Sequence, residues 1–248
     1  MTEYLYGIHP VLETVKAGRR SVQRAWLADR DAGGRLRAVR AALVQGGVAT
    51  TTAGRETLRR LCGSTEHQGA VVETTEYPYA GIDSLAALNR VVLLDNVEDP
   101  QNVGAVLRSA LFFGWRGVLL SQRGVPGVYP SVVKASAGAA DHLMIVRDRS
   151  ANRYLRWLLE HDFTVAVLDA AGTTTPETLA AAPPARLALV LGGEHRGVGQ
   201  YIRMNADYII GMPGRGPVTS LNASVAAGIA LYQLAVFPER VVPFKTQE

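Results

Sequence analysis

The sequence predicts an α/β protein with a small N-terminal domain and a larger C-terminal domain built on a mostly parallel sheet. Three observations predict this class. Short apolar runs rich in β-branched residues alternate with longer stretches of helical periodicity. From residue 90 onward, the runs expected as strands are continuously apolar, as in parallel strands that are buried on both faces. The 248 residues, 48% of them hydrophobic, suffice for one large domain or two modest ones.

Residues 1–75 are expected to form the small domain, and residues 76–88, which include Tyr77-Pro78-Tyr79, are expected to be a linker. The first helix should end at Gly18, because glycine readily adopts the left-handed conformation that closes a helix. In chain order we expect a helix over 8–17, a strand over 22–28, a basic helix over 34–45, a strand over 48–52, a short helix over 56–61 and a strand over 70–75.

The positive charge of the chain is concentrated in this small domain. Residues 1–75 hold 11 Lys and Arg against 7 Asp and Glu, whereas residues 76–248 hold 15 of each kind. Only three of the 26 basic residues are lysine, and the planar fork of arginine suits contacts to phosphate. A codon bias would give the same ratio, so nucleic-acid binding and an ordinary solvated face both stay open. The residues predicted to contact RNA are Arg35, Arg37, Arg40, Arg59 and Arg60.

Residues 89–240 are expected to form the larger domain, and residues 241–248 a tail. Asp99 and Pro100 mark the start of its first helix and Gly114 marks the end. In chain order we expect a strand over 91–95, a helix over 102–113, a strand over 117–121, a helix over 131–137, a strand over 143–146, a helix over 152–161, strands over 163–169, 187–191 and 208–211, and a buried helix over 221–237.

Three loops of this domain are candidates for binding a ligand, because ligands of such sheets bind beyond the carboxyl ends of the strands. The loops follow Leu94, Leu191 and Gly211. After the first loop, Asn102 and Arg108 point about 120° apart on one helix and could flank a polar site at its edge. Gly104 would leave room there. The alternative is a helix cap and a surface arginine.

The second and third loops are rich in glycine and proline. Glycine in the loop over 192–197 lets the backbone approach a ligand or turn tightly, but the spacing matches neither G-x-G-x-x-G nor a P-loop. Glu194 could bind a hydroxyl or an ammonium group, or pair with Arg196. The third loop holds two Pro and two Gly over 213–217, and we expect Thr219 or Ser220 to cap the helix that follows. Such a helix start can hold a polar or anionic group.

Other kinds of site lack support in the sequence. The five histidines and Cys62 show no metal-ligand spacing, so no metal is expected. A single cysteine excludes an intramolecular disulfide and fits a reducing cytoplasm, where we expect the protein to be located. No apolar run approaches the roughly 20 residues that a membrane span needs, so no membrane partner is expected.

Together, three segments resemble the motifs of the SpoU (TrmH-type) RNA 2′-O-ribose methyltransferases of the SPOUT superfamily. They are Asn102-Val-Gly-Ala-Val-Leu-Arg108, Leu191-Gly-Gly-Glu194-His-Arg-Gly197, and the run from Met212 through Ser220-Leu221-Asn222 to Ala227. Two further segments, Tyr6-Gly7-Ile8-His9-Pro10 and His67-Gln68-Gly69, are similar to the L30e-like RNA-binding extension of the branch that methylates a guanosine of 23S rRNA. The resemblance implies S-adenosylmethionine as cofactor, a homodimer, and a deep trefoil knot in the C-terminal domain.

The resemblance also implies roles for individual residues. Arg108 would act on the ribose hydroxyl as the base or as a stabiliser of the forming alkoxide, since an arginine normally stays protonated. The other catalytic residues implied are Asn102, Glu194, Ser220 and Asn222. Backbone contacts to the cofactor are implied for Leu191, Gly192, Gly193, Met212 and Leu221.

Ser220 and Asn222 would diverge by about 200° on one helix, so they converge only if Ser220 precedes it.

The sequence leaves two classes of function open. The first is a methyltransferase acting on 23S rRNA, with tRNA or a resistance-conferring rRNA as the rival substrate. The second is a non-catalytic RNA-binding or ribosome-assembly protein that retains the fold. The intact set of implied catalytic residues favours the enzyme.

Overall fold

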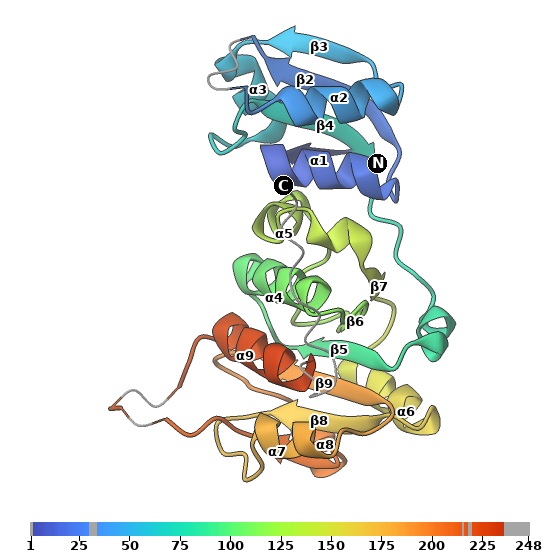
Figure 1. Cartoon of the computed structure of the whole chain (residues 1–248), viewed down its shortest axis with the longest axis vertical. Helices are drawn as coiled ribbons and strands as arrows, with labels where there is room; N and C mark the ends of the chain where they lie inside the picture. Colours follow the sequence, from blue (N-terminus) through green and yellow to red (C-terminus); the bar gives the residue numbers. More distant parts are fainter. Residues whose placement is uncertain (1, 30–33, 215, 218–219, 236–248) are drawn as a thin grey trace.

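The chain forms two sheets, one in each of two domains stacked along the long axis of the molecule (Figure 1). The computed structural model describes residues 2–29, 34–214, 216, 217 and 220–235. Thr219, the end of the predicted last helix and the tail of 241–248 lie outside the described residues. The N-terminal sheet has the strand order β1-β4-β2-β3, and the C-terminal sheet has the order β10-β8-β9-β5-β6-β7.

The N-terminal domain closely follows the prediction. Its elements are β1 (Thr2–Tyr6), α1 (Ile8–Ala17), β2 (Val22–Ala28), α2 (Arg37–Gln45), β3 (Thr50–Ala53), α3 (Arg55–Cys62) and β4 (Ala70–Thr75). Gly18 closes α1 with a φ of 60°, which confirms the predicted helix end. Strand β1 was not expected, because within it only Leu5 is fully buried and the run is very short.

The C-terminal domain contains the predicted parallel sheet, in which all five strand pairs are parallel. Its elements are η1 (Ile82–Ala87), β5 (Arg90–Asp95), α4 (Pro100–Phe112), β6 (Gly117–Leu120), α5 (Pro130–Ala135), η2 (Ala139–His142), β7 (Met144–Val146), α6 (Ala151–Glu160), β8 (Thr164–Leu168), α7 (Pro176–Ala181), β9 (Leu187–Gly192), α8 (Gln200–Met204), β10 (Tyr208–Ile210) and α9 (Ala223–Ala235). The short helices α7 and α8 were not expected. The deep trefoil knot stays a prediction.

Alternation along the strands of this sheet builds two cores. Val92 and Leu94 of β5 pack on the side of α4, α5 and α9, whereas Val91 and Leu93 pack on the side of α6 and α8. The strands are therefore buried on both faces, which accounts for their continuously apolar sequences. Helix α9 lies against the sheet beside α4 (Figure 1).

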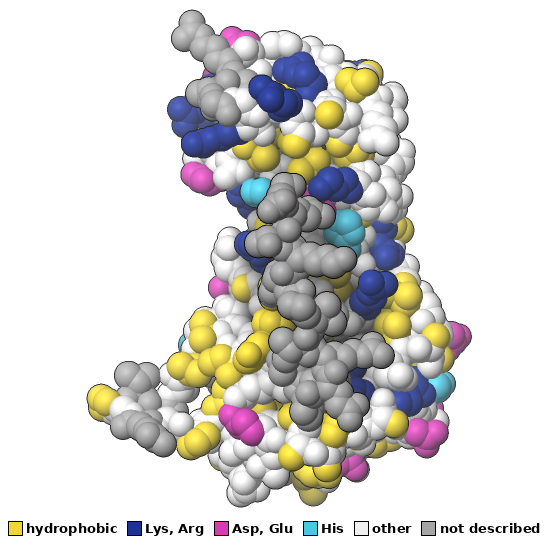
Figure 2. Space-filling view, viewed as in Figure 1, with side chains coloured by type: hydrophobic (Ala, Val, Ile, Leu, Met, Phe, Trp, Pro, Cys, Tyr) yellow, Lys and Arg dark blue, Asp and Glu magenta, His cyan; other side chains and the backbone are white. Residues whose placement is uncertain are grey.

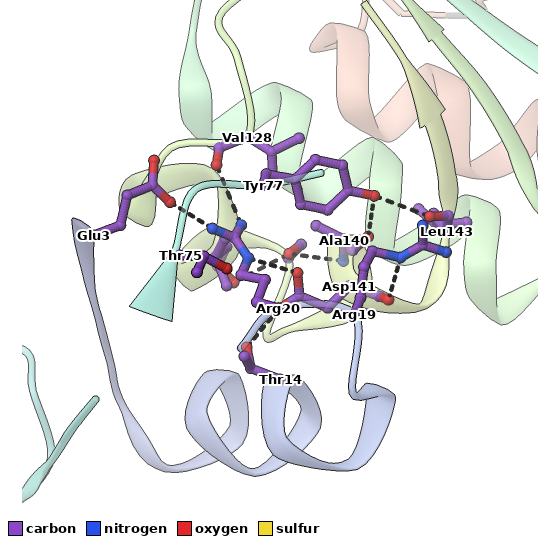
Figure 3. A network of polar contacts seen from close by, with 12 residues as sticks. Glu3, Thr14, Arg19, Arg20, Thr75, Tyr77, Val128, Ala140, Asp141 and Leu143 are labelled. Atoms are coloured by element: carbon purple, nitrogen blue, oxygen red, sulfur yellow. Dashed lines mark hydrogen bonds and ion pairs between the residues drawn. The ribbon is translucent and has the colours of Figure 1, made fainter. Parts of the chain in front are cut away.

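A buried ion-pair network joins the two domains (Figure 3). The fully buried side chain of Arg20 donates from Nε to the Asp141 carboxylate at 2.9 Å and from an Nη nitrogen to Glu3. The other carboxylate oxygen of Asp141 accepts the hydroxyl hydrogen bond of Thr14. The second Nη nitrogen of Arg20 donates to the Val128 carbonyl at 3.3 Å. Every charge in this joint is thus met by a partner, as burial of charge requires.

Tyr77, in the segment predicted as a linker, extends the joint. The Cζ atom of Arg20 lies 5.0 Å from the centre of its ring, and that of Arg19 lies 5.9 Å away. Its hydroxyl donates to the carbonyls of Ala140 at 3.1 Å and Leu143 at 3.0 Å. Burial raises the pKa of Tyr77 above its ordinary value. Tyr77 thus contacts both domains from within the segment predicted as a linker.

Candidate active site

The candidate site lies where the loops after β5, β8, β9 and β10 meet the start of α9. These are carboxyl ends of parallel strands, the place where ligands of such sheets bind. Two cavities open there, and Gly193 and Glu194 line both of them. Their volumes are about 370 and 360 Å³.

Three predicted residues, one from each motif, form a hydrogen-bonded cluster. The Asn222 amide donates to the Glu194 carboxylate at 2.7 Å and to the Asn102 side-chain oxygen at 3.0 Å. The Asn102 amide in turn donates to the same Glu194 oxygen at 3.3 Å. Residues separated by up to 120 positions are thereby fixed against one another.

Asn222 also caps α9, which corrects the expectation that Thr219 or Ser220 would do so. Its side-chain oxygen accepts from the backbone N–H groups of Ser224 at 3.0 Å and Val225 at 3.3 Å. Asparagine is among the best capping residues, because its oxygen reaches the free N–H groups of the first turn. Since the helix begins at Ala223, Ser220 precedes it, and the two side chains are not forced apart by helical geometry.

Glu194 lies at the amino end of α9, where the helix dipole favours a negative charge. In addition to the two amides, its Oε1 atom accepts the backbone N–H of Ala223 at 3.4 Å. Within the described chain all these bonds converge on Oε1, and the residue is exposed. The second carboxylate oxygen therefore remains available to a ligand.

Two glycines allow the loop after β9 to lie against its neighbours. A Cβ on Gly193 would come 1.8 Å from the Asn96 carbonyl oxygen, and one on Gly192 would come 2.4 Å from Gly197. Asp95 ends β5 beneath this loop and accepts the backbone N–H of Gly199 at 3.0 Å. Burial raises the pKa of Asp95, and the hydrogen bond from Gly199 partly opposes that rise.

All five residues predicted to bind the cofactor line the cavity of about 360 Å³. They are Leu191, Gly192, Gly193, Met212 and Leu221. Ser220 and Glu194 also line this cavity. Its walls combine apolar side chains with backbone that glycine leaves uncovered, which suits a flat, partly polar ligand.

Sequence reasoning missed one loop that lines this cavity, which holds Leu168, Asp169 and Ala170. The carboxylate of Asp169 accepts from Arg203 at 2.7 Å and from the backbone N–H of Ala171 at 2.9 Å. A signal was present, because this loop follows a continuously apolar strand and starts with a carboxylate. It resembles no motif, so nothing distinguished it from an ordinary turn.

The second cavity, of about 370 Å³, lies beside the start of α4. Gly193, Glu194 and Ala223 line both cavities, whereas Asn102 lines only the second. The residues that line it are Asn96, Val97, Glu98, Asp99, Asn102, Gly193, Glu194, His195, Arg196 and Ala223. Asp99 caps α4 by accepting the backbone N–H of Gln101 at 2.9 Å, so the helix begins two residues before the predicted Asn102.

The structure does not bring Arg108 into this cluster. Its side chain is exposed, lines neither cavity, and has no hydrogen-bond or ion-pair partner among the described residues. Gly104 does not make room for it either, since a Cβ there would lie 2.4 Å from the Cβ of Ala135. This glycine instead lets α4 pack closely against the end of α5.

The predicted RNA-binding arginines fall into two separate groups. Arg35 precedes α2, and Arg37 and Arg40 lie on it, whereas Arg59 and Arg60 lie on α3. The two helices pack on opposite faces of the N-terminal sheet. Arg59 also pairs with Glu56 at 2.7 Å, and the two groups do not form one continuous surface.

Within the described residues, no helix is both long and apolar enough to cross a membrane. The same part of the chain contains no group of three or more His, Cys, Asp or Glu side chains placed to bind a metal ion.

Two family models match the chain, one over its N-terminal part and one over its C-terminal part. The SpoU rRNA Methylase family matches residues 89–232, and the family described as "RNA 2′-O ribose methyltransferase substrate binding" matches residues 4–80.

Similar proteins match across most of the chain. An uncharacterised tRNA/rRNA methyltransferase of Mycolicibacterium vanbaalenii is 34% identical over 94% of this chain and 76% of its own. YacO of Bacillus subtilis, provisionally named a TrmH family tRNA/rRNA methyltransferase, is 32% identical over 94% of both chains. The crystal structure of the SpoU methyltransferase AviRb of Streptomyces viridochromogenes, in complex with AdoMet, has a TM-score of 0.76 at 23% identity and covers 94% of this chain and 88% of its own.

Proposed function

The chain belongs to the SpoU rRNA methylase family, and we propose that it transfers a methyl group from S-adenosylmethionine to a ribose 2′-hydroxyl of RNA. Membership in the family makes it an RNA methyltransferase. The observation that carries the rest of the proposal is the Asn102–Glu194–Asn222 cluster, which lies beside a cavity lined by all five predicted cofactor residues.

The cavity fits S-adenosylmethionine in its chemistry. Leu191, Met212 and Leu221 would hold the adenosyl group, and Gly192 and Gly193 leave backbone exposed for hydrogen bonds. When bound, the cofactor supplies an activated methyl group. What the protein must supply is the position of the hydroxyl and the removal of its proton. AviRb, a similar protein whose crystal structure contains AdoMet, has the same fold.

The amides of Asn102 and Asn222 fix the Glu194 carboxylate in place. A fixed carboxylate oxygen can accept a hydrogen bond from a ribose hydroxyl and thereby orient it. Ser220, on the cavity wall before α9, is placed to contact the same ligand. In this arrangement Arg108 would stabilise the negative charge that develops on the attacking oxygen.

Since Arg108 lies away from its own cluster, we propose that a homodimer completes the site. Arg108 is four residues before Phe112 on α4, so the two side chains share one face of that helix. Phe112 is 72% exposed, and Val225 and Tyr232 of α9 are 51% and 53% exposed. Figure 2 shows hydrophobic side chains on the surface over α9. A second copy docked on this surface would cover both the apolar residues and Arg108.

The proposed substrate is 23S rRNA, with a guanosine as the modified nucleotide and the cytoplasm as the location. The matched substrate-binding family at residues 4–80 and the basic character of residues 1–75 support an RNA substrate. The names of the relatives include both tRNA and rRNA, so tRNA is the alternative substrate that an experiment must distinguish from 23S rRNA.

The test is transfer of labelled methyl groups from S-adenosylmethionine to unmodified 23S rRNA, 16S rRNA and bulk tRNA, followed by nuclease mapping. We expect label in a 2′-O-methyl nucleotide of 23S rRNA. Label only in tRNA would preserve the reaction and replace the substrate. Cofactor binding without label in any of these RNAs would overturn the proposed reaction in favour of a non-catalytic RNA-binding protein.

A further inference from the structure

One face of the N-terminal sheet is only partly covered. Residues alternate along each strand, so that Leu5, Ala25 and Leu27 point to the core under α1 and α2. The opposite face bears Tyr4, Tyr6 and Trp26. The helix of the N-terminal domain that covers part of this face is the short α3, whose Leu58 packs on Ala53 and Val71.

The aromatic side chains on this face lie close to one another. Strand order and register place Tyr4 and Arg24 on either side of Glu73, and Tyr6 and Trp26 on either side of Val71. The rings of Tyr4 and Trp26 are 6.0 Å apart, centre to centre, and all three aromatic residues are partly exposed. A row of three partly exposed rings is thus held on β1 and β2, which flank β4, and the Tyr4 and Trp26 rings are tilted by 47° to one another.

Two cations lie over this row. The Cζ atom of Arg24 is 5.8 Å from the centre of the Trp26 ring. At the other end, the Nζ atom of Lys134 is 5.6 Å from the centre of the Tyr6 ring and donates to the Glu66 carbonyl at 2.8 Å. Lys134 belongs to α5 of the C-terminal domain. The row therefore leads from the outer part of the small domain toward the domain that holds the candidate active site.

The polar atoms of the aromatic side chains are not used within the described structure. Neither the hydroxyls of Tyr4 and Tyr6 nor the indole N–H of Trp26 has a hydrogen-bond partner among the described residues. Glu73 lies within the row, so the surface is not uniformly basic. Its chemistry is that of stacking rings with cations at the ends, rather than of a purely electrostatic phosphate site.

We propose that this surface, the stacking face of Tyr4, Tyr6, Arg24, Trp26 and Lys134, binds unpaired bases of the substrate RNA. Aromatic rings on a sheet bind single-stranded RNA because every base has a face that can stack, whereas bases within a duplex are not accessible. The excess of positive charge in residues 1–75 complements the RNA backbone. The inference rests on the proposed function, since it takes RNA to be the substrate.

Trp26 makes the surface directly observable. Of the three tryptophans in the chain, Trp115 and Trp157 are 1% and 5% exposed, so base stacking should alter mainly the Trp26 emission. We expect a short oligoadenylate to quench the fluorescence of the full chain and a duplex RNA of equal length to leave it nearly unchanged. Trp26→Phe should abolish the quenching while the oligoadenylate still binds.

Variants then separate stacking from other contacts. Tyr4→Ala and Arg24→Ala should each weaken oligoadenylate binding by about tenfold, whereas Tyr4→Phe keeps the ring and should bind nearly as the wild type does. Arg156→Ala, an exposed arginine on α6, is the matched control and should have no effect. Circular dichroism and thermal unfolding verify that each variant folds.

The outcomes distinguish this inference from the proposed function. Wild-type affinity in Tyr4→Ala and Arg24→Ala, or equal quenching by duplex RNA, would overturn the stacking face even if methyl transfer is observed. Quenching and weakened binding as expected, with no methyl transfer to any RNA, would support the stacking face and overturn the proposed reaction. A raised KM for RNA with an unchanged kcat in Tyr4→Ala would support both.

Discussion

Two polar clusters of this protein use similar side chains in opposite ways. At the domain joint, Arg20 and Asp141 have fully buried side chains, and their charges are met by other groups of the protein. At the candidate site, Glu194 is exposed, and its described hydrogen bonds leave one carboxylate oxygen unused. The first cluster is closed and fixes the architecture, whereas the second is open and can bind a ligand.

This difference shows what a polar network does in a fold. A closed network costs free energy when any member is removed, because the remaining buried charge loses its partner. An open network is fixed by bonds among its own members, here Asn102 and Asn222, yet keeps donors or acceptors for a substrate. Substitutions in the two clusters should therefore separate stability from activity.

The largest effect should come from Arg108→Ala. Loss of a positive group that stabilises a forming oxyanion lowers the rate by about 100-fold or more, so we expect almost no methyl transfer. Cofactor binding, measured by calorimetry, should persist, because Arg108 does not line the cavity. Arg116→Ala, another exposed arginine near the end of α4, is the control and should remain active.

Two further experiments, one of which uses Arg108→Ala again, test the proposed dimer. Because Arg108 shares a face of α4 with Phe112, Phe112→Asp should dissociate the dimer in sedimentation experiments and abolish transfer without altering the fold. Mixing Arg108→Ala with a Glu194→Ala variant should restore part of the activity if the two residues act from different copies. An active Arg108→Ala protein would remove this arginine from the mechanism.

The next effect concerns the joint. Asp141→Asn leaves the buried guanidinium of Arg20 with Glu3 as its only carboxylate partner among the described residues. We expect the free energy of unfolding to fall by about 3 kcal/mol, as measured by denaturant unfolding. Asp83→Asn, at an exposed position of η1, should leave stability unchanged. Equal stability of the two variants would contradict a structural role for the joint.

The sequence predicted the open cluster far better than the closed one. Glycine and proline around Gly192 and Met212 interrupt apolar strands, and this local pattern marked the loops that line the cavity. No comparable local sequence pattern indicates the residues of the domain joint. Arg20 follows a helix end and is typical of a surface residue, and its partner Asp141 is 121 positions away. Burial of a charge depends on tertiary contacts that no local pattern encodes.

The fold shows the same limit at the level of single elements. Helix α1 and strands β2 and β4 lie at the predicted residues, because caps and alternation specify them locally. Strand β1 was missed, since it is stabilised by pairing with β4, which lies some 70 residues later. The cap of α9 was predicted too early, because a hydroxyl residue was preferred over Asn222, whose side chain serves both the helix and the cluster.

The smallest effect should come from Asp95→Asn, the counterpart of Asp141→Asn beneath the candidate site. Burial raises the pKa of Asp95, so between the ordinary Asp pKa and the raised value the native state holds more protons than the unfolded state. This residue therefore makes stability fall as pH rises through that window, the reverse of a carboxylate stabilised by an ion pair.

Asparagine removes the titration and can still accept the N–H of Gly199. We expect Asp95→Asn to be more stable than the wild type at neutral pH and equally stable in acid below the ordinary Asp pKa. Unfolding curves recorded across this pH range measure the difference. A loss of stability at neutral pH would mean that the charge of Asp95 stabilises the fold. Asp95 would then have the same structural role as Asp141.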